Sequence, residues 1–269
     1  MMRRGEIAKG GAWALVTGAG SGIGRCYALQ LAQLGYRLLL VGIRRETLAV
    51  VQAECLAAGG AEVRIIVSDL ARTTAAQELY QTTFAEGIAP HVVINNAGIF
   101  SFCDILHTPA SRIEQLILLH TLTTTQLCRL YAAQMAQHGG GYILNMSSFS
   151  LWMPFPGLSL YSASKAYLRS FSVSFAKEVC EHNIRVTAVC PAGVATDLYG
   201  LTHSWQRLGR RVGVLISPEN CARRGLQALW RGRRCIVPDW WNRIWIPLCI
   251  LLPMCILRPI RRYTMKFQK

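Results

Sequence analysis

The sequence has 269 residues, of which 52% are hydrophobic and 16% charged, so it excludes a disordered chain and suits one large α/β domain with a buried core. Its ten cysteines are scattered without a CxxC pair or a His/Cys ligand spacing, which argues against a zinc site and against a disulfide framework. The net charge of +15 is uneven, because 14 Lys and Arg lie after His203 and only Glu219 and Asp239 oppose them, which indicates an anionic partner or else a solvated face that only aids solubility.

The first third of the chain predicts alternating strands and helices. Residues 13–17 (WALVT) form a β-rich run, and helical spacing of apolar residues follows over 22–34. A second strand is expected at 37–41, followed by a helix that begins after Arg44 and stops at Gly59-Gly60. A third strand is expected at 63–67 (VRIIV).

The same alternation continues to residue 189. Strands that are apolar throughout and separated by helices must be covered on both faces, which predicts an α/β fold with a doubly wound parallel (Rossmann-like) sheet. We expect one domain over 1–238 and an apolar, basic extension over 239–269. The further elements predicted are helix 73–86, strand 91–95, helix 111–137, strand 142–146, helix 162–181 and strand 184–189.

A glycine-rich loop joins the first strand to the first helix. Glycines allow a tight turn and a close approach of a pyrophosphate, while the helix N-terminus supplies N–H donors. At this point of a βαβ unit, the loop favours nucleotide binding over a structural turn. The residues expected to bind the phosphates are Thr17, Gly18, Ser21, Gly22, Ile23 and Gly24.

The loop sequence TGAGSGIG resembles the TGxxxGxG loop of the short-chain dehydrogenases/reductases. Further motifs of that family follow in order over roughly residues 10 to 200: Asp69 in SDL, Asn95-Asn96-Ala97-Gly98, Ser148, Tyr161-Ser162-Ala163-Ser164-Lys165, and Pro191 to Thr196. The resemblance implies an enzyme that moves a hydride between a nicotinamide cofactor and a carbonyl or alcohol.

The resemblance also implies further cofactor contacts. Asp69 would hold the adenine amino group, Asn95 and Gly98 would line the cleft, and Thr196 would bind the nicotinamide carboxamide. Taken alone, the NNAG segment is equally typical of a polar strand end followed by a turn. The other residues expected to contact the cofactor are Leu70, Asn96, Ala97, Pro191, Gly193 and Val194.

The end of the second strand indicates which nicotinamide is used. An NAD-selective site places a carboxylate there to bind the ribose 2′-OH, but this chain has Gly42 followed by Ile43 and Arg44. Arg44 and Arg25 could instead pair with a 2′-phosphate, unless Arg44 only solvates the start of a helix. We therefore expect NADP(H), with NAD(H) as the alternative cofactor.

Tyr161 and Lys165 are the expected catalytic pair. A phenol with a pKa of about 10 needs a nearby cation to act as an acid/base near neutrality. Lys165 lies four residues on, one helical turn away, and Ser148 would orient the substrate oxygen. The alternatives are an ordinary helix start with a packed Tyr161, and Ser147 in place of Ser148.

His120 marks a departure from the family pattern. The resemblance implies an asparagine in the middle of the fourth helix that holds a water linked to the lysine, and His120 falls at that place. A neutral imidazole could hold the same water or relay a proton itself. The alternative is a histidine that fills a polar gap.

The expected substrate is hydrophobic. By resemblance the segment 197–217 covers the substrate, and it contains Trp205 and several leucines and valines. The stretch 151–156 (LWMPFP) adds a second apolar wall. Such a pocket suits a bulky hydrophobic small molecule, a lipid- or steroid-like carbonyl or alcohol, rather than a sugar.

The extension indicates contact with an anionic membrane surface through residues 240–269. Its uncharged run of about 14 residues is too short to span a bilayer, but paired tryptophans and flanking arginines fit an interfacial element. The alternative is packing on the protein's own core or on a partner subunit. We expect a cytoplasmic protein, because the apolar stretch of a signal peptide is absent after Arg4, with peripheral contact on the cytoplasmic face of a membrane.

Two other interpretations remain open at this point. A non-catalytic nucleotide-binding or membrane-associated regulatory module could keep the same fold, and His120 is its only support. Nucleic-acid binding is not expected, because the arginines are mixed with a proline-broken apolar run that fits no docking motif. A homodimer or homotetramer is expected by resemblance only.

Overall fold

The structure of the protein is a computed structural model that describes residues 11–153, 155–195, 207, 215–239, 244 and 246. Four expectations therefore lie wholly or largely outside the described residues: the N-terminal segment, Thr196, the substrate cover over 197–217, and the extension over 239–269.

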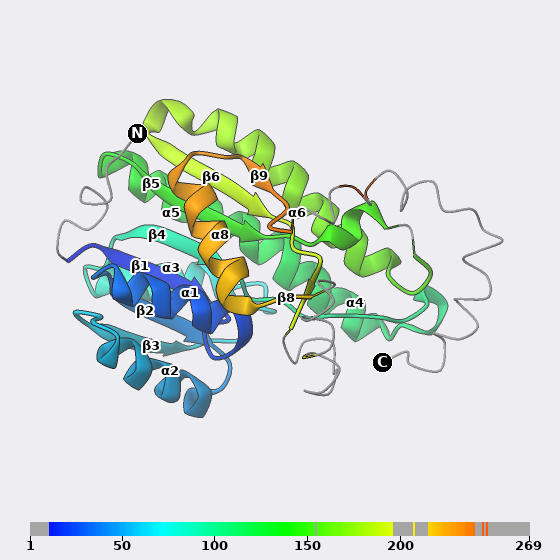
Figure 1. The fold of residues 1–269 in the computed structure, drawn as a ribbon, viewed down its shortest axis with the longest axis horizontal. Helices are drawn as coiled ribbons and strands as arrows, with labels where there is room; N and C mark the ends of the chain where they lie inside the picture. Colours follow the sequence, from blue (N-terminus) through cyan, green and yellow to red (C-terminus); the bar gives the residue numbers. More distant parts are fainter. Residues whose placement is uncertain are drawn as a thin grey trace.

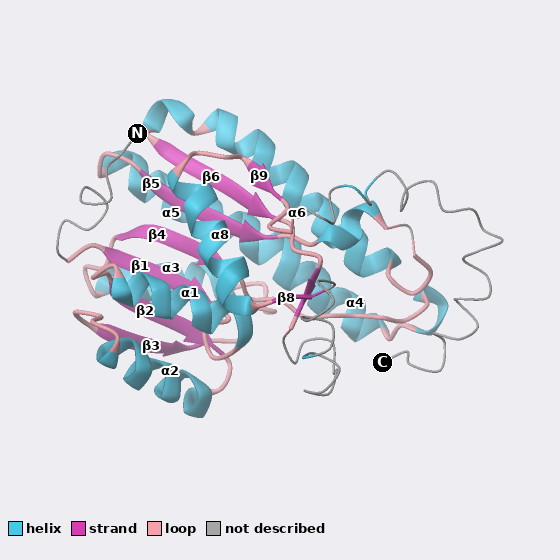
Figure 2. Ribbon diagram, in the orientation of Figure 1, coloured by secondary structure: helices cyan, strands magenta, loops and turns pink. Residues whose placement is uncertain are grey.

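Seven parallel strands form one sheet in the order β3-β2-β1-β4-β5-β6-β9, which confirms the doubly wound α/β fold (Figures 1 and 2). The register of each neighbouring pair is parallel. Their bounds are β1 Trp13–Thr17, β2 Arg37–Gly42, β3 Val63–Val67, β4 Pro90–Asn95, β5 Gly141–Met146, β6 Ile184–Val189 and β9 Cys235–Ile236.

Helices cover both faces of this sheet, as the apolar strands require. α1 (Gly22–Gln33), α2 (Arg45–Ala57) and α8 (Pro218–Trp230) pack on one face. α3 (Ala75–Ala85) and α5 (Thr124–Gln137) pack on the other, where α6 (Ser159–Glu178) joins them (Figure 1). Two apolar cores result, one on each side of the sheet.

The helix expected at 111–137 is interrupted. α4 (Ala110–Ile117) is followed by a π-helical turn, Leu118–Thr123, before α5 begins. A π turn carries more residues per turn than an α-helix, so it rotates the side chains that follow, and such turns are frequent at functional sites. His120 lies within this turn and is completely buried.

Several boundaries differ from the sequence predictions. α6 begins at Ser159 rather than at 162, so Tyr161 lies inside the first helical turn. The structure also adds α8, β9 and a short pair, β7 (Gly193–Val194) with β8 (Leu215–Ile216), none of which was predicted. A signal for α8 was present, because Ser217 caps the helix and Pro218 occupies its first turn.

Among the helices that the structure describes, none combines the length and the apolar character needed to cross a membrane.

Candidate active site

The carboxyl ends of the parallel strands place the predicted site residues at one edge of the sheet. β1 lies between β2 and β4 in the sheet. The connection after β1 leads to β2 on one side, and the connection after β4 leads to β5 on the other, so the strand order reverses at this point. Open α/β sheets bind ligands in the crevice at such a switch point. The loops that follow β1, β4 and β5 meet there and bring the phosphate loop, the NNAG segment and Ser148 to the same edge.

The glycines of the phosphate loop are required by close contacts. Gly18 has φ +62°, and a Cβ placed on it would lie 2.9 Å from the Ala97 Cα. A Cβ on Gly24 would overlap the carbonyl oxygen of Gly18. The loop and the start of α1 are therefore packed against the NNAG segment as closely as backbone allows.

The N-terminus of α1 fits an anion. Its N-cap, Ser21, makes no side-chain cap hydrogen bond, and the first turn contains no acidic residue. The first N–H groups of a helix have no partner within the helix and carry the positive end of its dipole. Together with the glycine cradle, these residues suit the pyrophosphate of a dinucleotide.

Thr17 and Asn96 join the two loops to each other. The Thr17 Oγ1 accepts hydrogen bonds from the N–H groups of Asn96 and Ala97, both at 3.0 Å. The Asn96 Nδ2 donates in return to the carbonyl oxygens of Thr17 and Gly18. These hydrogen bonds thus fix the phosphate loop and the NNAG segment, the two loops of the expected cofactor site, relative to each other.

Asn95 does not line the cleft with its side chain, which corrects one expectation. The side chain is 5% exposed, and its Nδ2 donates to the Asn145 Oδ1 at 2.8 Å. Asn145 donates in turn to the Ser172 Oγ. The amide belongs to a buried polar network that links β4, β5 and α6, because the last residue of a central strand is covered on both faces.

The two arginines expected near a 2′-phosphate differ in their surroundings. Arg25 forms a bidentate ion pair with Glu54, at 2.6 and 2.7 Å. Arg44 is the exposed N-cap of α2 and follows Gly42 at the end of β2. None of the ion pairs among the described residues involves Arg44, so its guanidinium is the better placed of the two to meet a phosphate.

The remaining cofactor residues lie at the same edge. Asp69 is exposed after β3, and its Oδ1 accepts a hydrogen bond from the Ala71 N–H at 2.9 Å. Leu70 is buried, and its carbonyl accepts from Thr123. The Pro191 carbonyl accepts from the Phe149 N–H at 2.8 Å, which ties the loop after β6 to the loop after β5.

Ser147 and Ser148 follow β5, and their hydroxyls differ in direction. The Ser147 Oγ donates to the Lys165 carbonyl at 2.6 Å and is therefore used to hold α6. The Ser148 Oγ caps the 3-10 turn Phe149–Trp152 by accepting from the Ser150 N–H at 3.1 Å. A hydroxyl that accepts still has its proton to donate, so Ser148 suits the substrate oxygen better than Ser147.

Tyr161 and Lys165 come together on one face of α6. The Lys165 Nζ lies 5.7 Å from the centroid of the Tyr161 ring, and each residue is 5% exposed. The ammonium donates to the Met146 carbonyl at 3.0 Å. Burial lowers the pKa of Lys165 to about 7, because a charged ammonium loses its hydration there.

His120 is held by hydrogen bonds at both ring nitrogens. Its Nε2 accepts from the Ile99 N–H at 3.1 Å, so the ring proton lies on Nδ1. Nδ1 then donates to the Ser164 Oγ at 2.9 Å, and Ser164 donates to the Tyr161 carbonyl at 2.7 Å. Burial and the nearby Lys165 hold the pKa of His120 well below its usual value, so the ring is neutral.

Two phenylalanines that the sequence analysis did not single out, Phe100 and Phe102, lie in the loop after the NNAG segment. Phe100 meets the Tyr161 ring edge to face, with centroids 5.1 Å apart. Phe102 stacks on Phe155 at 6.2 Å, and the Cys103 N–H donates to the Gly157 carbonyl. Phe100 and Phe102 follow the NNAG segment in no recognisable motif, and only their apolar character could have suggested this role.

No three His, Cys, Asp or Glu side chains gather to form a metal site in the part of the chain that the structure describes.

Comparisons with known proteins agree with this geometry. The sequence profile described as short chain dehydrogenase matches residues 12–207. A very-long-chain 3-oxoacyl-CoA reductase of Anas platyrhynchos is 35% identical over 194 residues, which cover 70% of this chain and 61% of that protein. The chain spans 61% or less of the length of the curated relatives that it matches.

The chain is also similar in structure to solved dehydrogenases. A short-chain dehydrogenase of Sphingobium yanoikuyae in complex with NADPH has a TM-score of 0.76 at 27% identity, over 87% of this chain and 92% of that one. The bulky-bulky ketone specific alcohol dehydrogenase of Comamonas testosteroni has a TM-score of 0.74 at 26% identity, over 87% and 90% of the two chains.

Proposed function

Because this chain belongs to the short-chain dehydrogenase family of oxidoreductases, we propose that it transfers a hydride between NADP(H) and the carbonyl or secondary alcohol carbon of a hydrophobic substrate. The observation that carries the proposal is the buried pair of Tyr161 and Lys165, with the Lys165 ammonium close to Gly98 of the NNAG segment. The nicotinamide ring, when bound, supplies or accepts the hydride.

The chain's own residues handle the proton. In reduction, the Tyr161 hydroxyl gives its proton to the oxygen of the substrate carbonyl as negative charge develops there. The Ser148 hydroxyl donates to the same oxygen and orients it. The charged Lys165, in a site of low dielectric, stabilises the phenolate that remains. Oxidation of an alcohol uses the same groups in reverse.

His120 takes a positioning role in this proposal. A proton relay through the ring would require one of its two hydrogen bonds, to Ile99 or to Ser164, to break. With both bonds kept, the imidazole connects the NNAG segment to the turn of α6 that carries Tyr161. The ring thereby fixes the distance between the cofactor loop and the catalytic tyrosine.

NADP(H) is the preferred cofactor in this proposal. Gly42 leaves no carboxylate at the end of β2 to repel a 2′-phosphate, and the exposed Arg44 can donate to one. Similar proteins were solved with NADPH or NADP. Arg25 has two of its guanidinium nitrogens paired with Glu54, so Arg44 is the main partner of the 2′-phosphate in this proposal.

A hydrophobic substrate is supported by the walls around Tyr161. Phe100, Phe102 and Phe155 join the half-buried Leu151, Trp152 and Met153 on this side of the site. Two similar proteins are named a very-long-chain 3-oxoacyl-CoA reductase and a bulky-bulky ketone specific alcohol dehydrogenase, and both names describe large carbonyl substrates. We propose a bulky or long-chain carbonyl compound as the substrate class.

We also propose that residues 240–269 contact an anionic membrane surface. One residue of this segment, Ile246, packs on the apolar cluster of Phe149, Cys190 and Val237. Ile244, two residues earlier, is 60% exposed. The tryptophans and arginines of the segment suit the interface between lipid tails and headgroups.

Self-association is proposed as well, as a homodimer or homotetramer. Tyr167, Phe171 and Phe175 form a stacked row along α6, with centroids 6.0 and 5.2 Å apart. Tyr167 is 41% exposed, so part of this row faces outward. Light scattering on the purified protein would measure the assembly, and a monomeric mass would contradict it.

An assay of NADPH oxidation with a panel of ketones tests the proposed reaction. We expect turnover with bulky apolar ketones and much slower turnover with sugars or small polar ketones. Binding of NADPH without turnover of any carbonyl compound would favour a non-catalytic nucleotide-binding module.

A further inference from the structure

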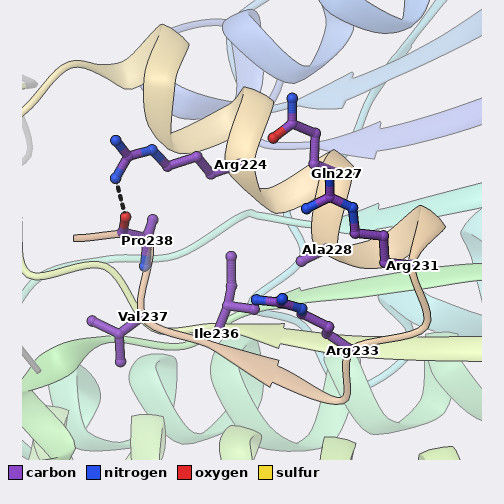
Figure 3. A pocket seen from close by; sticks show the side chains of 8 residues that line it. All are labelled: Arg224, Gln227, Ala228, Arg231, Arg233, Ile236, Val237 and Pro238. Atoms are coloured by element: carbon purple, nitrogen blue, oxygen red, sulfur yellow. Dashed lines mark hydrogen bonds between the residues drawn. The ribbon is translucent and has the colours of Figure 1, made fainter. Parts of the chain in front are cut away.

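Three arginines line a hollow between α8 and β9, far along the chain from the catalytic residues. The hollow has a volume of about 130 Å³ and is walled by Arg224, Arg231 and Arg233, with Gln227 between them (Figure 3). Arg231 and Arg233 are exposed, and Arg224 is half-buried. A hollow of this size and charge suits a phosphate group.

Among the residues that the structure describes, no carboxylate lines the hollow. Residues 215–239 contain five arginines and only two acids, Glu219 and Asp239. Glu219 lies beside α1, where its carbonyl accepts from the Gln30 Nε2 at 3.0 Å, and the Asp239 Oδ2 accepts from the Ala192 N–H at 3.4 Å. The ion pairs recorded for the described part of the chain include none of the three arginines.

The backbone that carries the arginines is fixed. The Arg233 carbonyl accepts from the Thr187 Oγ1 at 2.7 Å, and the Arg234 carbonyl accepts from the Ala188 N–H at 2.9 Å. The Arg224 guanidinium donates to the Pro238 carbonyl, a bond drawn in Figure 3. Ordering of this surface on binding therefore costs little backbone entropy.

Stabilisation of the helix explains only part of this charge. A cation in the last turn of a helix interacts favourably with its dipole, which accounts for Arg231 at the C-cap of α8. The effect falls off within one turn, so it does not account for Arg224 in the middle of α8 or for Arg233 beyond the helix. The helix dipole therefore leaves Arg224 and Arg233 without a counter-charge among the recorded ion pairs of the described residues.

We infer that the surface formed by Arg224, Arg231 and Arg233 binds phosphate groups of an anionic lipid bilayer. The hollow includes Pro238, and the apolar, tryptophan- and arginine-containing sequence begins at Trp240. A basic surface that is followed in the sequence by an apolar stretch with tryptophans matches the headgroup and tail regions of a bilayer. The inference rests on the membrane contact proposed above and adds a folded surface to it.

Partition of the full chain into vesicles tests the inference. We compare phosphatidylcholine vesicles with vesicles that also contain phosphatidylglycerol, using the parent, the Arg231→Gln/Arg233→Gln variant and the Arg129→Gln/Lys177→Gln control. The control removes two exposed cations from α5 and α6, on the other face of the sheet. Each arginine near an anionic surface contributes about a fivefold factor, so we expect roughly 30-fold weaker partition for the first variant.

The control should partition like the parent, and high salt should weaken the binding of the parent to anionic vesicles. All three proteins should reduce a soluble ketone equally, because neither pair of substitutions touches the catalytic site. Equal partition of the first variant and the parent would overturn the inference while leaving insertion of 240–269 in place. A parent that binds neither vesicle would overturn both proposals.

Discussion

His120 and Ser164 share a hydrogen bond of 2.9 Å between Nδ1 and Oγ, and this bond leads to the backbone of Tyr161. The imidazole is completely buried within a π-helical turn and accepts from Ile99 at its other nitrogen. The two bonds together require a neutral ring. A second proton, on the Nε2 of His120, would point at the Ile99 N–H, and the positive charge of the ring would lie near that of Lys165.

This arrangement predicts a loss of stability in acid that depends on His120. The pKa of His120 is lowered in the folded state, so below about pH 6.5 the unfolded chain binds a proton that the folded chain does not. The free energy of unfolding of the parent should therefore fall as the pH drops below that value. Denaturant unfolding of His120→Asn should show a smaller fall, and the exposed His107→Asn should match the parent.

The same substitution separates positioning from proton relay. If His120 positions Tyr161, His120→Asn should lower kcat while the shape of the pH–rate profile stays the same. A profile whose apparent pKa moves in the variant would instead indicate that the ring takes part in proton transfer.

The lowered pKa of Lys165 predicts that the free energy of unfolding also depends on pH in the alkaline range. Its pKa is about 7 in the folded protein, so between about pH 7 and pH 10 the unfolded chain holds a proton that the folded chain has lost. The contribution of Lys165 to stability should rise with pH through this window. Comparison of Lys165→Met with the parent by urea unfolding isolates that contribution. Parallel stability curves for the two proteins would contradict the lowered pKa.

Arg44 is predicted to select the cofactor. A charge-assisted hydrogen bond to a phosphate is worth about 1.5–3 kcal/mol, so Arg44→Ser should lower kcat/KM for NADPH by roughly 10- to 100-fold. The value for NADH should change little, because NADH lacks the 2′-phosphate. Arg25→Ser should have a smaller effect on NADPH, since Glu54 already pairs with that guanidinium. A parent with higher efficiency for NADH than for NADPH would contradict the preference.

Gly24 is predicted to be required for cofactor binding. A Cβ at this position would overlap the carbonyl of Gly18, so Gly24→Ala should displace the phosphate loop and raise the KM for NADPH by at least about tenfold. Gly35→Ala is the control, because a Cβ there meets nothing within 4 Å. Its φ of +79° carries a strain of about 1 kcal/mol, which should appear in stability and not in KM. Unchanged NADPH binding in Gly24→Ala would contradict the predicted cradle.

The strands β1 to β6 could be predicted from the sequence because each contains several consecutive apolar residues and is followed by a helical pattern or a turn. β9 could not, since it has two residues and is held by its pairing with β6, almost fifty residues earlier in the chain. The π turn at Leu118–Thr123 was missed for a related reason. Apolar spacing averaged over a long helix does not reveal one turn that carries extra residues.

Some features of the site can likewise be predicted from the sequence, and others cannot. Motif spacing predicts roles for Tyr161, Lys165, Ser148 and the phosphate loop, since these predictions depend on positions within one helix or one loop. The pairing of Arg25 with Glu54, and the buried direction of the Asn95 side chain, depend on residues from other elements. Phe100 becomes a neighbour of Tyr161, and Phe102 a neighbour of Phe155, only through the fold.

The exchange Tyr161→Phe measures whether Tyr161 gives the proton to the substrate, with Tyr167→Phe on the same helix as the control. Tyr161→Phe removes the proton donor and keeps the ring that packs on Phe100, so kcat for ketone reduction should fall by about 10²- to 10⁴-fold while NADPH still binds. Tyr167 is 41% exposed, so the Tyr167→Phe variant should reduce ketones at the same rate as the parent. Equal rates of turnover for Tyr161→Phe and the parent would show that Tyr161 is not the proton donor.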